Sequence, residues 1–230
     1  MNFYAKYIKR IQDLLIAFVM CIVLSPILLI ITILVKVKLG TPVIFKQNRP
    51  GLNNRIFTLY KFRTMTNMKD KNGNLLPDEQ RMTKFGEWLR STSLDELPEI
   101  FNILNGDLSW VGPRPQLVKD LVFMNKKERQ RHKVRPGLTG LAQVSGRNNI
   151  DWDEKFRYDL EYINNITFFN DWKIMFQTVH KVFCKEGINT EGLVTSEDLG
   201  DYLLRIGRIA KKEYLAGLEK SEQLIKHQKK

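Results

Sequence analysis

Cysteine and histidine are scarce in this chain of 230 residues, which contains two cysteines and three histidines. Cys21 and Cys184 stand far apart with no metal-ligand spacing, and the histidines form no HExxH pattern. This scarcity argues against a zinc site and against a disulfide framework. We expect free thiols in a reducing compartment.

Acidic residues are outnumbered, with 25 Asp and Glu against 37 Lys and Arg and a formal net charge of +12. Such an excess attracts phosphates, nucleic acid or anionic lipid, and charge alone does not choose among them. Tandem repeats and low-complexity tracts are absent from the sequence. The length predicts one domain, at most with an appended segment, and excludes a large multidomain protein.

Charge is missing altogether from Leu14 to Val35, a run of 22 residues in which only Ser25, Pro26 and Thr32 lie outside the apolar set. As a helix it would measure about 33 Å, enough to cross a bilayer core of about 30 Å. The run is too long for a cleaved signal peptide, and no small-residue cleavage pattern follows it. The sequence therefore predicts a membrane segment.

The topology of this segment stays open between a spanning helix and a re-entrant hairpin. Pro26 removes a backbone hydrogen bond at the centre and Ser25 can bond back to a freed carbonyl, so a kink is expected at mid-depth. The positive-inside rule does not separate the two ends, because basic residues flank both of them: Lys6, Lys9, Arg10, Lys36 and Lys38.

The rest of the chain predicts a hairpin followed mainly by helices. Residues 43–65 read as two strands around the turn-rich NRPGLNN, with Lys61 in the second strand. A polar loop over 67–80 precedes helices over about 81–104, which are broken near Arg90. Residues 108–150 are dense in Gly, Pro and Arg and are expected to be mostly loop and short strand.

Two amphipathic helices and a helical tail are predicted beyond residue 150. Asp151 and Glu154 form a capping box for the first, and the second starts near Asn170. Its apolar stripe is typical of a core-facing helix, although beside a membrane anchor it would also suit the interface plane. The tail from Ser196 to Lys230 reads as a further helix, peripheral to any chemistry.

Two adjacent acids in the segment SLDELPE, Ser93 to Glu99, have two readings. Ser93 suits an N-cap and Glu96 completes a capping box, so the acids would simply stabilise a helix start. The same helix start would keep Asp95 ionised beside a place for phosphate, as a nucleophile requires. Attack on phosphate would then need a divalent cation and several Arg or Lys groups to neutralise the charge.

Suitable cations are concentrated in the Gly- and Pro-rich middle of the chain. Arg114 lies between Pro113 and Pro115, whose fixed φ angles suit a rigid, bidentate phosphate contact. The stretch RHKVRPGLTG, Arg131 to Gly140, combines cations with glycines that let backbone amides point at an anion. For any one of these arginines alone, a solvated surface charge is the commoner role.

A third pattern, Asp151-Trp152-Asp153, matches the DxD pattern of metal-dependent glycosyltransferases. Three residues are a weak signal, and the capping box already accounts for both acids. We treat this pattern as structural.

Six ordered segments carry a wider resemblance: the Ser-Pro kinked membrane segment, QNRPG (47–51), YKFRTM (60–65), SLDELPE (93–99), GDLSWVGPRP (106–115) and RHKVRPGLTGLAQVSGRN (131–148). Together they resemble the bacterial sugar transferases, which are monotopic polyprenyl-phosphate phosphoglycosyl transferases. The likeness covers roughly residues 4–195 and is greatest to the small members that act on UDP-N,N'-diacetylbacillosamine.

The resemblance implies an α+β fold that is mostly helical, with a re-entrant membrane helix over 1–40, broken at Ser25 and Pro26. A compact cytoplasmic catalytic domain over 41–195 would contain the small β-hairpin and interfacial amphipathic helices. Residues 196–230 would form a C-terminal helical extension, longer than in minimal members, that strengthens membrane attachment, mediates oligomerisation or contacts a pathway enzyme. The protein would face the cytoplasm on the bacterial inner membrane.

The resemblance also implies the reaction. Asp95 would attack the β-phosphate of a UDP-sugar, release UMP and form a covalent phosphosugar intermediate, which undecaprenyl phosphate would then take up to initiate glycan assembly. Mg²⁺ is the implied cofactor, with Asp95 as a ligand, and Glu96 would orient the nucleophile, help hold the metal or assist proton transfer. The substrate-binding residues would be Arg90 for the lipid phosphate, Lys61, Arg114 and Arg135 for the nucleotide sugar, and Asp171.

Two other functions stay open at this point. One is a DxD-type, membrane-associated glycosyltransferase that releases UDP instead of UMP. The other is a non-enzymatic, membrane-tethered protein that binds nucleic acid or acidic lipid through its excess of positive charge. The sugar and the oligomeric state cannot be read from the sequence.

Overall fold

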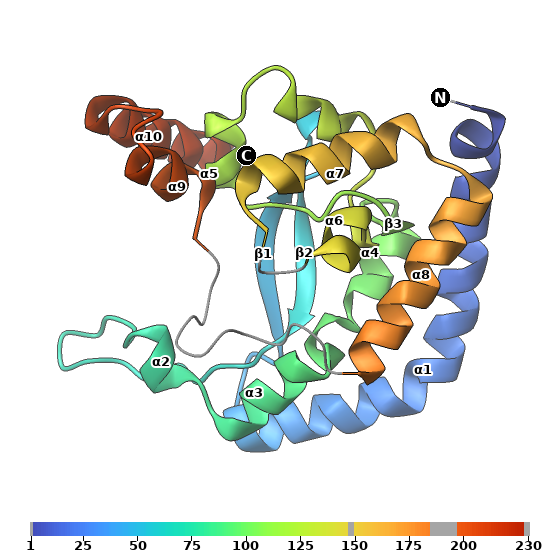
Figure 1. Ribbon diagram of the computed structural model, residues 1–230. Coiled ribbons are helices and arrows are strands. Elements are labelled where there is room, and N and C mark those ends of the chain that lie inside the picture. Colours follow the sequence, from blue (N-terminus) through green and yellow to red (C-terminus); the bar gives the residue numbers. More distant parts are fainter. Residues whose placement is uncertain (1, 147–149, 185–196, 228–230) are drawn as a thin grey trace.

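The structure is a computed structural model that describes residues 2–146, 150–184 and 197–227 (Figure 1). It is mostly helical, as expected, with two small two-stranded sheets among the described residues. The N-terminal elements are a π-helical turn (Tyr4–Ile8), α1 (Lys9–Leu39), β1 (Ile44–Pro50), β2 (Ile56–Phe62), α2 (Asp78–Arg81), α3 (Lys84–Ser91), a 3₁₀ turn (Leu94–Glu96) and α4 (Glu99–Asn105). The remaining elements are β3 (Ser109–Val111), α5 (Val118–Phe123), a 3₁₀ segment (Glu128–Lys133), β4 (Gly137–Thr139), α6 (Leu141–Ser145), α7 (Trp152–Asn164), α8 (Phe168–Phe183), α9 (Leu199–Arg205) and α10 (Lys211–His227).

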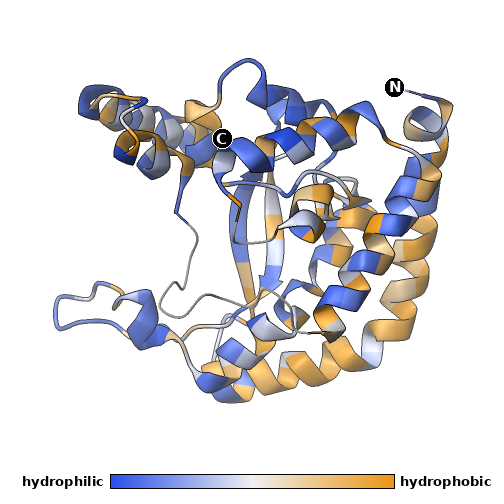
Figure 2. Ribbon diagram, viewed as in Figure 1, coloured by the Kyte–Doolittle hydropathy of each residue, from blue (hydrophilic) through white to orange (hydrophobic). Residues whose placement is uncertain are grey.

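Helix α1 contains the predicted membrane segment and bends within its length. It descends along one edge of the molecule and then turns to run beneath it (Figure 1). Pro26 lies inside the helix, and the Ser25 hydroxyl donates to the Ile22 carbonyl at 2.8 Å, as the sequence predicts for a Ser-Pro break. Figure 2 shows how apolar this helix is, and side chains such as Phe18 (61%) and Leu29 (61%) are largely exposed. Among the described residues, this is the one helix long and apolar enough to cross a membrane.

Polar contacts fix the first half of α1 to the rest of the molecule. The buried Asp13 carboxylate accepts from the Ser109 hydroxyl at 2.7 Å and from the Trp110 amide at 3.3 Å, at the start of β3. Arg10 donates to the carbonyls of Ile103 and Leu104 at the carboxyl end of α4. The first half of α1 is therefore tied to β3 and to the carboxyl end of α4.

The predicted hairpin is confirmed: β1 and β2 pair antiparallel, with Phe45 opposite Lys61. Asn102 of α4 ties the hairpin to the segment that follows, because its side chain accepts from the Tyr60 amide and donates to the Thr58 carbonyl. Asn102 is fully buried. This contact places Lys61 beside the amino end of α4.

The helical stretch predicted over 81–104 is confirmed, and so is its predicted break near Arg90 to Ser93, which separates α3 from the 3₁₀ turn and α4. The capping box predicted at Ser93 is wrong. Ser93 has a left-handed backbone, with φ of 55°, and its side chain makes no capping hydrogen bond. The chain turns sharply there, so Asp95 and Glu96 lie in a tight turn between two helices and not in the first turn of a long one.

The Gly-rich middle is less irregular than expected. β3 and β4 form a parallel pair, and α5 and α6 are short helices that composition did not predict. The two strands approach closely because Gly137 has no side chain. A Cβ at this position would lie only 2.1 Å from the Gly112 amide nitrogen. The motif residues Arg147 and Asn148 lie outside the described residues.

The late helices follow the sequence closely. Asp151 caps α7 by accepting from the Glu154 amide at 2.8 Å, as predicted, whereas α8 begins at Phe168, slightly earlier than expected. The tail folds as two helices instead of one, because Gly207, with φ of 72°, turns the chain between α9 and α10. The boundary expected at 195/196 lies outside the described residues.

Candidate active site

A compact charged cluster surrounds the turn between α3 and α4. Glu96 lies at its centre: its Oε1 accepts from Lys61 Nζ at 2.6 Å and from Arg114 Nη2 at 2.7 Å. Asp95, the neighbouring residue, is 9% exposed, and its carboxylate accepts no hydrogen bond within the described part of the chain. The structure therefore brings together four residues that the sequence analysis singled out separately: Asp95, Glu96, Lys61 and Arg114.

Glu99 is a third acid of this cluster, and the sequence analysis missed it. Its side chain is almost fully buried, and its Oε1 lies 3.1 Å from Lys61 Nζ. Its spacing could have indicated this position. Glu99 follows Glu96 by three residues, which is the separation of neighbouring side chains along one side of a helix. Lys61 is thus shared between Glu96 and Glu99.

Burial and charge push the acids of the cluster in different directions. Burial, reinforced by the charge of Glu96, raises the pKa of Asp95 to about 6. Burial alone would also raise the pKa of Glu96, but the charges of Arg114 and Lys61 outweigh it and hold that pKa well below its usual range. Burial raises the pKa of Glu99 to about 7. Neighbouring acids with separated pKa values are typical of catalytic sites.

Arg114 is presented by a segment whose backbone is held from both sides. The buried Arg131 donates to the Arg114 carbonyl at 2.7 Å and pairs with Asp159 of α7. Arg49, from the QNRPG motif, donates to the Pro115 carbonyl at 3.1 Å. These contacts, with the fixed φ angles of the two prolines, give Arg114 the rigid presentation that the sequence predicted.

Arg90 lies at the rim of the same cluster, in the last turn of α3. Its Nε donates to the Thr64 hydroxyl at 3.1 Å. Burial lowers the pKa of Arg90, and the nearby Asp95 charge opposes that change. Arg90 is therefore close enough to Asp95 for the two charges to interact.

Arg135 lies elsewhere. Its Nε donates to the Gly106 carbonyl at 2.9 Å, at the carboxyl end of α4, where Arg10 also lies. Asp95 and Glu96 precede the amino end of α4, and a helix of this length separates its two ends by about 10 Å. The structure does not bring Arg135 into contact with the acid cluster.

Asp171 also lies apart from the acid cluster. It is 1% exposed, and its carboxylate accepts from Tyr4 and Tyr162, each at 2.8 Å, and pairs with Lys9. In this structure it joins α8 to the start of the membrane segment. Its predicted contact with substrate is untested.

The acids of the DxD pattern are occupied by other contacts. Asp151 caps α7, and Asp153 forms an ion pair at 2.6 Å with Arg208, which lies between α9 and α10. No group of three or more His, Cys, Asp and Glu side chains that could hold a metal ion by themselves occurs among the described residues. These contacts support the interpretation that both acids of the pattern stabilise the fold.

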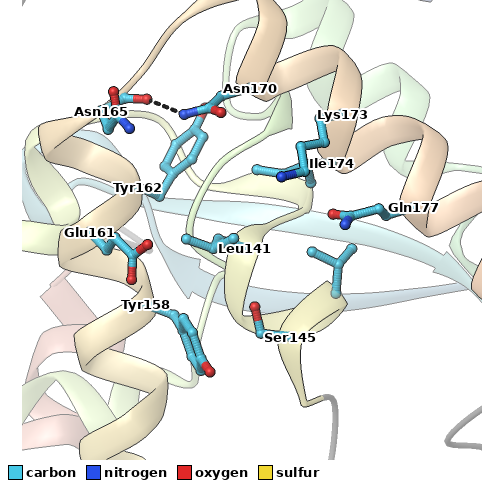
Figure 3. A pocket seen from close by; sticks show the side chains of 11 residues that line it. Leu141, Ser145, Tyr158, Glu161, Tyr162, Asn165, Asn170, Lys173, Ile174 and Gln177 are labelled. Carbon is cyan, nitrogen blue, oxygen red and sulfur yellow. Dashed lines mark hydrogen bonds between the residues drawn. The ribbon is translucent and has the colours of Figure 1, made fainter.

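A separate cleft of about 480 Å³ lies between α6, α7 and α8 (Figure 3). Its lining is largely polar and includes Ser145, Glu161, Asn165, Lys173 and Gln177. The acid cluster does not contribute to this lining. The cleft is therefore distinct from the candidate active site.

The donor set at Asp95 suits a magnesium ion that is completed by substrate. Mg²⁺ prefers oxygen ligands and is often held by one or two carboxylates, with phosphate oxygens and water filling the remaining positions. Glu96 and Glu99 are both engaged by Lys61, whereas the Asp95 carboxylate has no cationic partner within hydrogen-bonding distance in the described residues. Asp95 is thus the acid of the cluster that fits this role.

Comparison with known proteins places this geometry in a family. Residues 4–185 match the bacterial sugar transferase family. An uncharacterised sugar transferase of Bacillus subtilis, EpsL, is 50% identical over 190 residues, covering 83% of this chain and 94% of the relative. A UDP-glucose:undecaprenyl-phosphate glucose-1-phosphate transferase of Klebsiella pneumoniae is 44% identical over 189 residues, which cover 76% of this chain.

A third relative is the UDP-N-acetylgalactosamine-undecaprenyl-phosphate N-acetylgalactosaminephosphotransferase of Aeromonas hydrophila, 36% identical over 187 residues and 76% of this chain. The chain spans only 40% and 44% of the length of the Klebsiella and Aeromonas proteins, but nearly all of EpsL. The family match extends from the membrane helix through the acid cluster to α8. This chain therefore belongs to the bacterial sugar transferases.

Proposed function

We propose that this chain transfers a sugar 1-phosphate from a UDP-sugar to undecaprenyl phosphate, giving undecaprenyl diphosphate-sugar and UMP. The observation that carries the proposal is the difference between the surroundings of two adjacent acids, Glu96 and Asp95. Glu96 forms ion pairs with Lys61 and Arg114. Asp95, next to it, forms no such direct ion pair among the described residues, although the charges of Lys61, Arg90 and Arg114 act on it from nearby. The printed activities of the Klebsiella and Aeromonas relatives support the same class of reaction.

The proposed reaction has two steps on one phosphorus atom. A carboxylate oxygen of Asp95 attacks the β-phosphorus of the UDP-sugar, the bond to the bridging oxygen breaks, and UMP leaves with that oxygen. A phosphate oxygen of undecaprenyl phosphate then attacks the same phosphorus, the acyl–phosphate bond breaks, and the Asp95 carboxylate is regenerated. The Asp95 pKa of about 6 keeps most of this carboxyl ionised at neutral pH.

Cations around the turn would neutralise the phosphates. Lys61 and Arg114 already converge on Glu96 and have further N–H groups that can donate to the β-phosphate. Arg90 lies in the last turn of α3, close enough to Asp95 for their charges to interact. This position suits the incoming lipid phosphate. Glu96 then acts by holding Lys61 and Arg114 in place, which gives the second acid an orienting role.

Mg²⁺, bound through Asp95, would supply further neutralisation of the phosphate charge. Glu99 shares Lys61 with Glu96 and so helps to fix the ammonium group at the same point.

Because Mg²⁺ would neutralise phosphate charge, removing it should abolish UMP release without unfolding the chain. A circular dichroism spectrum recorded with and without EDTA provides the control.

The exposed apolar surface supports a membrane-bound arrangement. The bent helix α1 carries many exposed apolar side chains, and α8 exposes Phe169 (82%) and Phe176 (65%). We propose that α1 enters the inner membrane and returns, with both ends cytoplasmic, while α8 lies in the interface plane. The active-site turn would then meet a lipid phosphate at the headgroup level and a soluble UDP-sugar from the cytoplasm.

Labelling of single cysteines tests this topology. Lys6→Cys and Lys38→Cys, made in a Cys21→Ser and Cys184→Ser background, should both react with an impermeant maleimide only from the cytoplasmic side. Labelling from opposite sides would show a spanning helix and overturn the re-entrant arrangement.

The sugar is tested by a UMP-release screen over a panel of UDP-sugars with undecaprenyl phosphate and Mg²⁺. UDP-N,N'-diacetylbacillosamine is the first candidate by family likeness, and UDP-glucose, UDP-galactose and UDP-N-acetylgalactosamine complete the panel. UMP release that is lost in Asp95→Asn supports the proposal. Release of UDP would indicate a one-step glycosyltransferase, and salt-sensitive binding without turnover would indicate a non-enzymatic binder.

A further inference from the structure

The C-terminal helices α9 and α10 lie beyond the part of the chain that matches the family, residues 4–185, yet they pack directly against α5. Phe123, at the end of α5, is the centre of this contact. Its ring stacks on Tyr214 at 5.9 Å between centroids, and a Cβ on Gly217 would lie 2.4 Å from it. A Cβ on Gly200 would lie 2.6 Å from the same ring. We call this pair of helices, residues 197–227, the C-terminal lobe.

One buried carboxylate joins the C-terminal lobe to the segment that presents Arg114. Asp120, in α5, is 1% exposed. Its Oδ1 accepts from the Leu199 amide at 2.9 Å, at the start of α9, and its Oδ2 accepts from the Leu117 amide at 2.9 Å. Leu117 follows Arg114 by three residues. The Asp120 side chain therefore links the C-terminal lobe, through one oxygen, to the Arg114 segment, through the other.

Other contacts support the same attachment. Lys119 pairs with Asp198, and the Trp152 indole donates to the Glu197 carbonyl at 3.2 Å. The start of the lobe is thus held both by α5 and by α7. Its attachment does not depend on the Phe123 contact alone.

The backbone that presents Arg114 is held at three points. The Arg114 carbonyl accepts from Arg131, and the carbonyl of Pro115, whose φ is fixed, accepts from Arg49. The third point is the Leu117 amide, which donates to Asp120. Loss of this third contact would leave the segment that follows Arg114 less constrained and would loosen the position of the Arg114 guanidinium.

We infer that the C-terminal lobe is a positioning element for Arg114, that it acts through Asp120, and that it raises the affinity of the site for the phosphates of the nucleotide sugar. The part played by Arg114 rests on the proposed function. Asp120 is a positioning residue because it reaches the reacting groups only through the backbone of the Arg114 segment.

Hydrogen exchange tests the structural link without any need for activity. Gly200→Leu combined with Gly217→Leu places two side chains into Phe123, whereas the control Ala216→Leu adds the same side chain at an exposed position of α10. In the double variant we expect the Leu117 amide to exchange about tenfold faster, as the lobe amides do, with no change in the control. Faster exchange in the lobe without a change at Leu117 would overturn the inference. Unchanged exchange throughout would overturn it as well, because Phe123 would then not pack on the glycines.

Kinetics test the consequence for substrate. For Asp120→Asn and for the double glycine variant we expect KM for the UDP-sugar to rise about fivefold to tenfold, with kcat and KM for undecaprenyl phosphate within about twofold of the parent. A fall in kcat with unchanged KM would indicate mere loss of folded protein and contradict a positioning role. If the parent chain releases no UMP with any UDP-sugar, the proposed function fails, while the exchange experiment still decides whether the lobe is coupled to the Arg114 segment.

Discussion

The guanidinium of Arg114 donates to the carboxylate of Glu96 at 2.7 Å, although 18 residues separate them in sequence. Lys61 approaches the same carboxylate oxygen from β2. Glu96 thus fixes both cations beside Asp95, the residue for which we propose the role of nucleophile.

Asp95→Asn should stabilise the protein at neutral pH. Burial raises the pKa of Asp95 to about 6, above that of an unfolded Asp, so the folded protein loses stability from this group as pH rises from about 4 to about 6. Removing the charge should restore up to about 3 kcal/mol at pH 7, from about 1.4 kcal/mol per pKa unit, and almost nothing at pH 3.5. Urea unfolding of both proteins at the two pH values measures the difference.

Glu96→Gln provides the opposite control. The pKa of Glu96 is held below its usual range, so its charge stabilises the fold above about pH 4, and its loss leaves Lys61 and Arg114 without this partner. This variant should be less stable than the parent at pH 7. A gain in stability for Glu96→Gln, or a loss for Asp95→Asn, would contradict the assigned charges.

In the metal-free protein the Asp95 carboxyl should titrate with an apparent pKa near 6. Its pKa is raised first by burial and then by the charge of Glu96. In Glu96→Gln that midpoint should move to lower pH, because a negative neighbour is gone while Lys61, Arg90 and Arg114 remain. Carbon NMR of the Asp95 carboxyl in EDTA, recorded against pH, measures the midpoint, and an unmoved midpoint in Glu96→Gln would contradict the coupling of the two acids.

Breaking the buried pair of Arg131 and Asp159 should cost about 3–5 kcal/mol of folding free energy. Both side chains are at most 5% exposed, so either single substitution, Arg131→Met or Asp159→Leu, leaves a buried charge unpaired. The double variant should recover much of that loss, because no buried charge remains. Denaturant unfolding of all four proteins gives the coupling energy, and additive effects of the two single variants would argue against a mutual pair.

The same double variant should still weaken substrate binding. Arg131 also donates to the Arg114 carbonyl, and Met cannot replace that contact. We expect KM for the UDP-sugar to rise about fivefold in the double variant even where stability is restored. Recovery of both stability and KM would show that Arg131 acts only through its ion pair.

The exposed aromatic rings of α8 should contribute to membrane binding. Phe169 and Phe176 are 82% and 65% exposed and would each bury apolar area at a lipid surface. Phe169→Ser with Phe176→Ser should lower the partition of the protein onto liposomes by about tenfold, while Lys211→Ser, on the exposed start of α10, should have little effect. Co-sedimentation with liposomes measures both, and equal binding of all variants would place α8 away from the membrane.

Local patterns predicted local structure well. The uncharged run with Pro26 indicated a long, broken apolar helix, and Asp151 with Glu154 indicated the start of α7, because helix length, kinks and caps depend on residues within one or two turns. The same reasoning failed at Ser93, which adopts a left-handed backbone where the chain turns and α3 packs against the 3₁₀ turn. The glycine at 207, read locally, would have divided the tail into its two helices.

The sequence by itself determined the apolar helix, the hairpin, the late helices and the motif residues from which Asp95, Glu96, Lys61 and Arg114 were chosen. Only the tertiary structure decided which of those residues meet. It placed Arg135 at the far end of α4 and Asp171 against the membrane segment, and it added Glu99 and Asp120. The physical reason is that charge pairing acts over a few ångströms in space. The distances between these residues are set by the packing of β2 against α4 in one core cluster and by the hydrogen bonds that hold the Arg114 segment.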